Sequence, residues 1–223
     1  YRRGIGKGLK DHPAVALSLQ LREEAHQRFA ISAISRLSSS IGSSDIHLLP
    51  MNAVTNNDNK SGALLAAVME VTSIGSVQID SNGRPEVDFC LLSTEHDVQV
   101  MRDAVARSLQ VLEQKAFTDV VSATYCDNLG TSCDWLVAAP TDQFDQWMLQ
   151  NVGVYAHAGC SLRMGSTADD DAVVDTDGAV IGHQALWVCD ASIFPDLPRA
   201  NPQLAVTMLA ERIAPRIAGW LGL

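Results

Sequence analysis

Three short segments in the last third of the chain carry side chains that could do chemistry. His157 lies six residues before the run Arg163-Met164-Gly165, Asp190 closes an apolar run, and Asn201 stands directly before Pro202. A neutral imidazole is a suitable proton acceptor because histidine titrates near physiological pH. The segments therefore offer a proton acceptor, a carboxylate and a side-chain amide.

Each of these residues also has a structural interpretation. A lone histidine in a stretch of Ala and Gly is commonly a structural or surface residue, and an Asp at the end of a strand commonly belongs to a turn. Asn201 is expected to cap a helix that has Pro202 at its first position. The N-terminus of such a helix favours anions, so a capping role and a site role for Asn201 are compatible.

The acidic residues of the same region do not predict a metal site. Their spacing does not match the calcium-loop pattern D-x-[DN]-x-[DN]-G, and no Glu closes a loop. Asp175–Gly178 is instead expected to form a hairpin turn. The histidines lack zinc-ligand spacing, and no G-x-S-x-G elbow supports hydrolase chemistry. The acidic residues considered are Asp169, Asp170, Asp171, Asp175 and Asp177.

The composition is that of an ordinary globular protein, with 223 residues, 47% hydrophobic and 19% charged. The formal net charge of −10 argues against a nucleic-acid partner. No apolar run reaches the roughly 18 residues of a membrane span. The five cysteines are odd in number, scattered and never in C-x-x-C, which favours reduced thiols and a cytoplasmic location.

The periodicity predicts an α+β fold, with an antiparallel sheet that has helices on one face. Apolar or alternating runs predict strands, and helical spacing predicts helices, without βαβ regularity. The strongest helix signal starts at Thr94, which forms a capping-box pair with Asp97. The other expected helices are Arg22–Leu37 and a helix after Pro140. The expected strands are Val15–Leu21, Asp45–Val54, Ala63–Val71, Gly75–Asp80 and Glu86–Leu92.

Four blocks of sequence, taken together, resemble one enzyme family. They are Tyr155–Gly165 (YAHAGCSLRMG), Asp190-Ala191-Ser192, Asn201-Pro202, and Gly4–Pro13 (GIGKGLKDHP), here called the junction block. Their order and spacing resemble the C-terminal part of the glucose-methanol-choline (GMC) oxidoreductases, and the junction block is similar to that family's VGxNLxDHP. These are FAD enzymes that oxidise alcohols. The chain is therefore identified as the C-terminal part of a GMC oxidoreductase.

The resemblance implies catalytic roles for His157 and Asn201. His157 stands at the position of the family's catalytic histidine in H-x-x-G-T-x-R-M-G, although Cys160 replaces the usual Gly and Ser161 the usual Thr. Asn201 stands at the second active-site position. A glycine often marks a close approach of the backbone, so Cys160 in its place affects how closely the backbone can approach the flavin.

The resemblance also implies which residues contact FAD. Asp190 and Ala191 are expected beside its ribityl–pyrophosphate part. Pro202, Gln203 and Leu204 are expected beside the isoalloxazine, with backbone N–H groups of the last two directed at the ring.

The implied domains are a junction from the FAD domain (1–13), a substrate-binding domain (14–151) and a return segment of the FAD domain with the catalytic residues (152–223). The family's G-x-G-x-x-G dinucleotide loop is not among these residues. Gly4-x-Gly6-x-Gly8 does not replace it, because no strand precedes it and Asp11-His12-Pro13 follows where a helix should begin. An N-terminal FAD-binding part is therefore expected to complete the enzyme.

The leading hypothesis is an FAD-dependent alcohol oxidase or dehydrogenase, choline dehydrogenase-like, in which His157 takes the hydroxyl proton and flavin takes a hydride. Two alternatives stay open. One is a hydroxynitrile-lyase-like enzyme that uses FAD structurally, and the other is a non-catalytic fragment that lacks the dinucleotide-binding loop.

Overall fold

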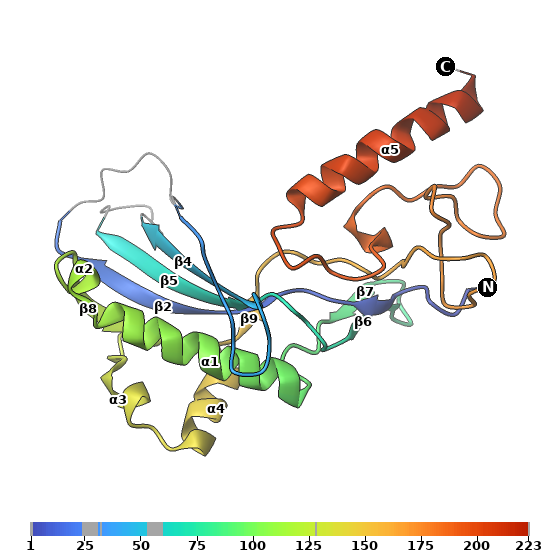
Figure 1. Cartoon of the computed structure of the whole chain (residues 1–223). Coiled ribbons are helices and arrows are strands. Elements are labelled where there is room, and N and C mark those ends of the chain that lie inside the picture. The colour runs from blue at the N-terminus through green and yellow to red at the C-terminus, as the bar shows by residue number, and fades with distance from the viewer. Residues whose placement is uncertain (1, 24–30, 32, 53–59, 128, 223) are drawn as a thin grey trace. The chain divides into compact units, whose positions relative to one another are not determined.

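The computed structural model describes residues 2–23, 31, 33–52, 60–127 and 129–222. Contacts divide the chain into two compact units (Figure 1). Unit 1 comprises Tyr1–His12, Glu70–Ser93 and Val154–Leu223, and unit 2 comprises Pro13–Met69 and Thr94–Gly153. The expected substrate domain (14–151) differs from unit 2 mainly in the segment Glu70–Ser93, which groups with unit 1, and by one or two residues at each end.

Unit 2 is built on an antiparallel sheet with the strand order β3-β4-β5-β2-β8. Alternation predicts the first long strand correctly, because Val15, Leu17 and Leu19 are buried whereas Ala16 is exposed. The strands are β2 (Pro13–Leu21), β3 (Ser35–Leu37), β4 (Ile46–Asn52), β5 (Ser61–Val68) and β8 (Val121–Tyr125).

Helix α1 (Glu95–Leu112) packs along this sheet against β4 and β5 (Figure 1). The Thr94 side chain accepts a hydrogen bond from the backbone N–H of Asp97, so the predicted cap is confirmed. The Arg102 guanidinium donates two hydrogen bonds, from Nε and from Nη2, to the Asp145 carboxylate, each at 2.7 Å. This pair joins α1 to α4. The remaining helices are α2 (Lys115–Thr118), α3 (Asp134–Val137) and α4 (Thr141–Asn151). The α+β fold class is confirmed.

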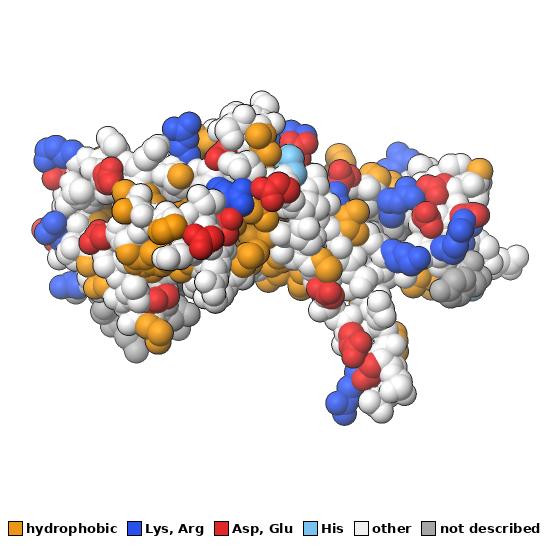
Figure 2. Space-filling view, turned by 90° about the horizontal axis from the view of Figure 1, so that it is seen from below, with side chains coloured by type: hydrophobic (Ala, Val, Ile, Leu, Met, Phe, Trp, Pro, Cys, Tyr) orange, Lys and Arg blue, Asp and Glu red, His pale blue; other side chains and the backbone are white. Residues whose placement is uncertain are grey.

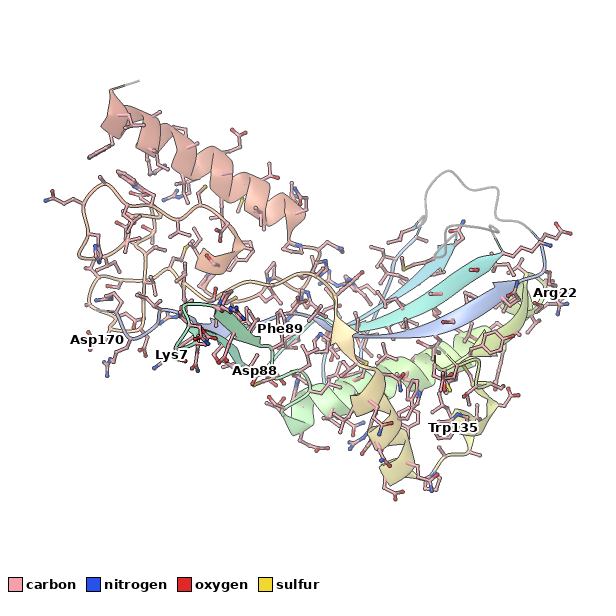
Figure 3. The ribbon with its side chains drawn as sticks, turned by 180° about the vertical axis from the view of Figure 1, so that it is seen from behind. Lys7, Arg22, Asp88, Phe89, Trp135 and Asp170 are labelled. Carbon is pink, nitrogen blue, oxygen red and sulfur yellow. The ribbon has the colours of Figure 1, made fainter. Side chains whose placement is uncertain are left out.

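The helix expected over Arg22–Leu37 is wrong at its described C-terminal end. Residues 24–30 and 32 lie outside the described part of the chain, but Ser35–Leu37 is the strand β3 and pairs with Ile46–Leu48 of β4. The spacing of apolar residues fits a helix, yet hydrogen bonds from a neighbouring strand decide the conformation of so short a segment. Arg22 lies just past the end of β2, and Trp135 lies on α3 (Figure 3).

Unit 1 contains the three-stranded sheet β1-β6-β7, which is antiparallel. Gly6 has a φ of +73°, and a Cβ on it would collide with the carbonyl oxygen of Val77 in β6. A Cβ on Gly75 would likewise meet the backbone of Asp88 and Phe89, which Figure 3 labels. Gly6 and Gly75 therefore allow backbone segments of this sheet to approach closely. The strands are β1 (Lys7–Leu9), β6 (Gly75–Ile79) and β7 (Pro85–Asp88), and β9 (Gly153–Val154) lies at the unit boundary.

The core of unit 1 forms where helix α5 (Gln203–Leu221) lies on the irregular segments that precede it. Leu209 and Ile213, one turn apart, are buried against Val173 and Ile193. Asp177 pairs with Arg212 and Arg216 of α5, at 3.2 and 2.6 Å, and so fixes the turn after Asp175 to the helix. The turn itself matches the expectation, because Gly178 donates its N–H to the Asp175 carbonyl. The short 3-10 helix η1 spans Ala191–Ile193.

The surface carries mixed charges. On the face shown in Figure 2, acidic and basic side chains lie close to one another, and neither kind gathers into a broad patch. Within the described ranges, no helix is both long enough and apolar enough to cross a membrane. All five cysteines are described, and none is bonded to another.

Candidate active site

The junction block holds the backbone around His157 in place within unit 1. Lys10 and Gly159 exchange both backbone hydrogen bonds, at 3.0 and 3.1 Å, and Tyr155 donates its N–H to the His12 carbonyl at 3.0 Å. The Asp11 carboxylate accepts the N–H of His157 with both oxygens, at 3.0 and 3.1 Å. The segments 10–12 and 155–159 thus run side by side, although they are separated by most of the chain.

The His157 imidazole contacts three polar side chains. Its Nδ1 lies 2.9 Å from Nδ1 of His12, and its Nε2 lies 3.2 Å from Nδ2 of Asn201. The Tyr155 ring packs on the imidazole with centroids 4.2 Å apart. His157 is 8% exposed and His12 is fully buried, so the Nε2 side is the one that opens toward the exposed Asn201. The two sequence-predicted catalytic residues are therefore brought together.

Burial sets the protonation of the site. Desolvation lowers the pKa of His157, so the imidazole is neutral at pH 7 and can accept a proton. Burial raises the pKa of Asp11, and the N–H groups of His157, His12 and Tyr155 act against that rise by donating to its carboxylate. Burial also raises the pKa of Tyr155, while the nearby Asn201 side chain acts in the opposite direction.

The expected capping role of Asn201 is wrong. Helix α5 begins at Gln203 with Pro202 as its N-cap residue, and no side chain caps it. The Asn201 amide is directed at His157 instead. Pro202 therefore precedes the first helical residue, and its carbonyl accepts the N–H of Val206 at 2.8 Å.

The expected cofactor residues lie in two places in unit 1. Asp190 and Ala191 begin the turn of η1, where the Asp190 carboxylate accepts the Ser192 N–H at 2.8 Å. The Ala191 carbonyl accepts the N–H of Cys160, so this turn runs beside the segment that follows His157. Gln203 and Leu204 are exposed in the first turn of α5, and Leu204 is 81% exposed.

Cys160 departs from the family pattern without placing its side chain on the open side of the site. Its φ is +71°, a conformation that favours glycine, and its side chain is buried in the core with Ile193 and Phe194. Burial raises the pKa of this thiol to about 11, so it stays protonated at pH 7. Arg163 forms an ion pair with Asp169 at 2.7 Å, and the Met164 N–H donates to the Ile193 carbonyl.

Two residues at this site were not predicted to face His157. The sequence placed His12 only in the junction block, and Tyr155 only in the block Tyr155–Gly165. The available signal was the proline after His12, which restricts the preceding residue to extended backbone and so limits where its ring can lie. In the described part of the chain, no group of three or more His, Cys, Asp or Glu could hold a metal ion.

Comparison with known proteins matches the chain to one family. A family model described as GMC oxidoreductase matches residues 71–210, which is more than half of the chain. The chain belongs to the GMC oxidoreductases. It corresponds to their C-terminal part.

Sequence relatives match with partial coverage of their own length. An oxygen-dependent choline dehydrogenase of Pectobacterium atrosepticum is 32% identical over 178 residues, which cover 77% of this chain and 30% of that protein. An uncharacterised GMC-type oxidoreductase of Rhodococcus erythropolis is 26% identical over 98% of this chain and 42% of its own length. The chain thus spans less than half of the curated relatives it matches.

Solved structures share the fold at lower identity. Pyridoxine 4-oxidase from Mesorbium loti superimposes with a TM-score of 0.78 and 22% identity, over 96% of this chain and 44% of that chain. A formate oxidase variant from Aspergillus oryzae gives a TM-score of 0.80 and 16% identity, over 98% of this chain and 48% of that chain. At these identities the likeness supports the fold alone.

Proposed function

We propose that this chain is the catalytic C-terminal part of an FAD-dependent enzyme that oxidises an alcohol. The observation that carries the proposal is the pairing of His157 with Asn201, whose Nε2 and Nδ2 atoms lie 3.2 Å apart at the exposed N-terminus of α5. A buried neutral imidazole beside an amide is an arrangement that can accept a hydroxyl proton and hold the oxygen that loses it.

The residues around this pair fit a flavin. The Ser192 hydroxyl is buried in the turn after Asp190, and no hydrogen-bond partner is found for it among the described residues. The exposed side chain of Leu204 offers an apolar surface that a planar ring could cover, next to the open N–H groups of a helix start. Asp190, Ala191 and Ser192 would hold the ribityl–pyrophosphate part of FAD. Pro202, Gln203 and Leu204 would lie against its isoalloxazine ring.

In the proposed reaction the alcohol O–H proton moves to Nε2 of His157, and the Asn201 amide donates a hydrogen bond to the alcohol oxygen. The carbon–hydrogen bond of the alcohol breaks as the carbonyl forms. When bound, the flavin supplies the acceptor for that hydride. The helix N-terminus favours the negative charge that develops beside it.

The test uses the full-length protein with its flavin bound. Anaerobic addition of an alcohol should bleach the visible flavin band in a single turnover, and release of the corresponding carbonyl product should accompany the bleaching. Choline is the first alcohol to try, because sequence relatives are named oxygen-dependent choline dehydrogenases. A flavin that stays oxidised with choline and with a panel of aliphatic and aromatic alcohols would contradict the proposal.

A further inference from the structure

Two histidine rings in unit 1 share one hydrogen bond. His12 and His157 are 145 residues apart in sequence, yet their Nδ1 atoms lie 2.9 Å apart, with ring centroids at 5.1 Å and planes at 89°. Two ring nitrogens at this distance hold one proton between them, so one histidine donates and the other accepts.

The contact on the far side of the ring decides which histidine donates. The Asn201 amide nitrogen faces Nε2 of His157, and an amide nitrogen can only donate. Nε2 therefore carries a lone pair, and the ring proton of His157 lies on Nδ1, directed at Nδ1 of His12. The opposite tautomer would place an N–H of His157 against an N–H of Asn201.

The position of His12 is itself fixed by its burial and by its backbone. It is fully buried, and its carbonyl accepts the Tyr155 N–H at 3.0 Å. Pro13 follows it and restricts its backbone to the extended region. Its neighbour Asp11 accepts the backbone N–H of His157 with both carboxylate oxygens. The junction block thus fixes both the backbone and the ring of His157 through consecutive residues.

We propose that His12 is a positioning residue for His157: it accepts the Nδ1 proton of His157 and so keeps Nε2 unprotonated and directed toward the substrate hydroxyl. The inference rests on the proposed function, in which His157 is the base. When Nε2 takes the hydroxyl proton, the bond from Nδ1 to His12 persists and gives the imidazolium an acceptor. Among the described residues, the titratable groups that contact His157 are His12, Asp11 and Tyr155.

Two amide substitutions of His12 separate positioning from packing. Asn places its side-chain oxygen near the position of the histidine Nδ1, whereas Gln places its amide near the position of Nε2. H12N therefore keeps an acceptor for His157 and H12Q removes it, while both keep a polar amide at the site. Both variants are made in the full-length flavoprotein, and flavin content and thermal unfolding are measured for each.

The readout is the anaerobic rate of flavin reduction at saturating alcohol, together with the pH dependence of kcat/KM. H12Q should reduce its flavin roughly 10- to 100-fold more slowly than the unmodified protein, the loss expected when a catalytic group is misplaced by about 1 Å. Its apparent alcohol affinity should change only a few-fold. The acid limb of its pH profile should move to lower pH, since the imidazolium has lost an acceptor. H12N should have the flavin-reduction rate of the unmodified protein, and the acid limb of its kcat/KM profile should lie at the same pH.

Equal rates for H12N and H12Q, whether both fast or both slow, would overturn the inference, because only one of them keeps the acceptor. A parallel measurement on H157A tells this failure apart from failure of the proposed function. If H157A is slow while H12Q is normal, His157 remains the base and only the role of His12 is lost. If H157A is also normal, His157 is not the base.

Discussion

Replacing His157 with Ala in the full-length protein should slow flavin reduction by an alcohol by roughly two to four powers of ten, the usual contribution of a positioned acid–base group. At about 1.4 kcal/mol for each factor of ten, the activation barrier would rise by about 3–5 kcal/mol. The reason lies in the site, where Nε2 of His157, which we infer to be the unprotonated nitrogen, faces the exposed Asn201. Anaerobic stopped-flow absorbance of the flavin band measures the rate directly.

The same substitution should also cost stability, which has to be measured alongside. His157 is 8% exposed, and its removal takes a hydrogen-bonding partner from the buried ring of His12. A buried polar group that loses such a partner costs about 1–3 kcal/mol. The matched control is H183A, because His183 is exposed in the same unit and the chemical change is identical. H183A should keep both the rate and the melting temperature.

The pH dependence gives a second check on His157. Burial lowers its pKa from the ordinary 6.5, and the neutral form is the one that accepts a proton. The value of kcat/KM should therefore rise with pH, with a midpoint below 6.5, and stay level through pH 7 as far as this group is concerned. The variant H157A should lack that limb. A flavin-loaded H157A protein with near-normal reduction would remove His157 from the mechanism.

Three further outcomes are expected. N201A should slow flavin reduction by about 100-fold, as removal of one donor to a developing oxyanion does. Its free energy of unfolding should change by less than about 0.5 kcal/mol, since Asn201 is exposed and does not cap α5. A loss of stability with unchanged kinetics would restore the capping role. Thiol titration of unfolded, unreduced protein should find all five cysteines, and a count of three or fewer would show disulfides. The 223-residue chain alone, mixed with FAD and desalted, should show no stoichiometric flavin band, because no Gly-rich loop is present to bind the pyrophosphate; a full band would refute this.

The parts of the fold that the sequence predicts well are those where local preference and tertiary contacts agree. Strand β2 alternates because one face of its sheet is buried, and α1 starts at Thr94 because a capping side chain and an apolar stripe coincide there. The helix expected up to Leu37 failed for the opposite reason. Ser35–Leu37 has helical spacing with its neighbours, but pairing with β4 satisfies its backbone.

The proposed catalytic pair, His157 and Asn201, was predicted through motifs, and not through any local periodicity. No pattern in the sequence relates His157 to Asn201, because α5 brings the amide to the imidazole only when its core residues Leu209 and Ile213 pack on unit 1. His12 was harder still to assign, since its partner lies 145 residues away.

Asn201 and His12 share one property that helps to find such residues. By local rules Asn201 should cap a helix, and His12 should only hold an extended backbone before Pro13. Both side chains instead contact the two nitrogens of one imidazole. Side chains that do not take the role predicted by local sequence rules are expected at functional sites, because a site requires contacts that local conformational preferences do not favour. That both departures converge on His157 is an argument for its role that is independent of the motif that first singled it out.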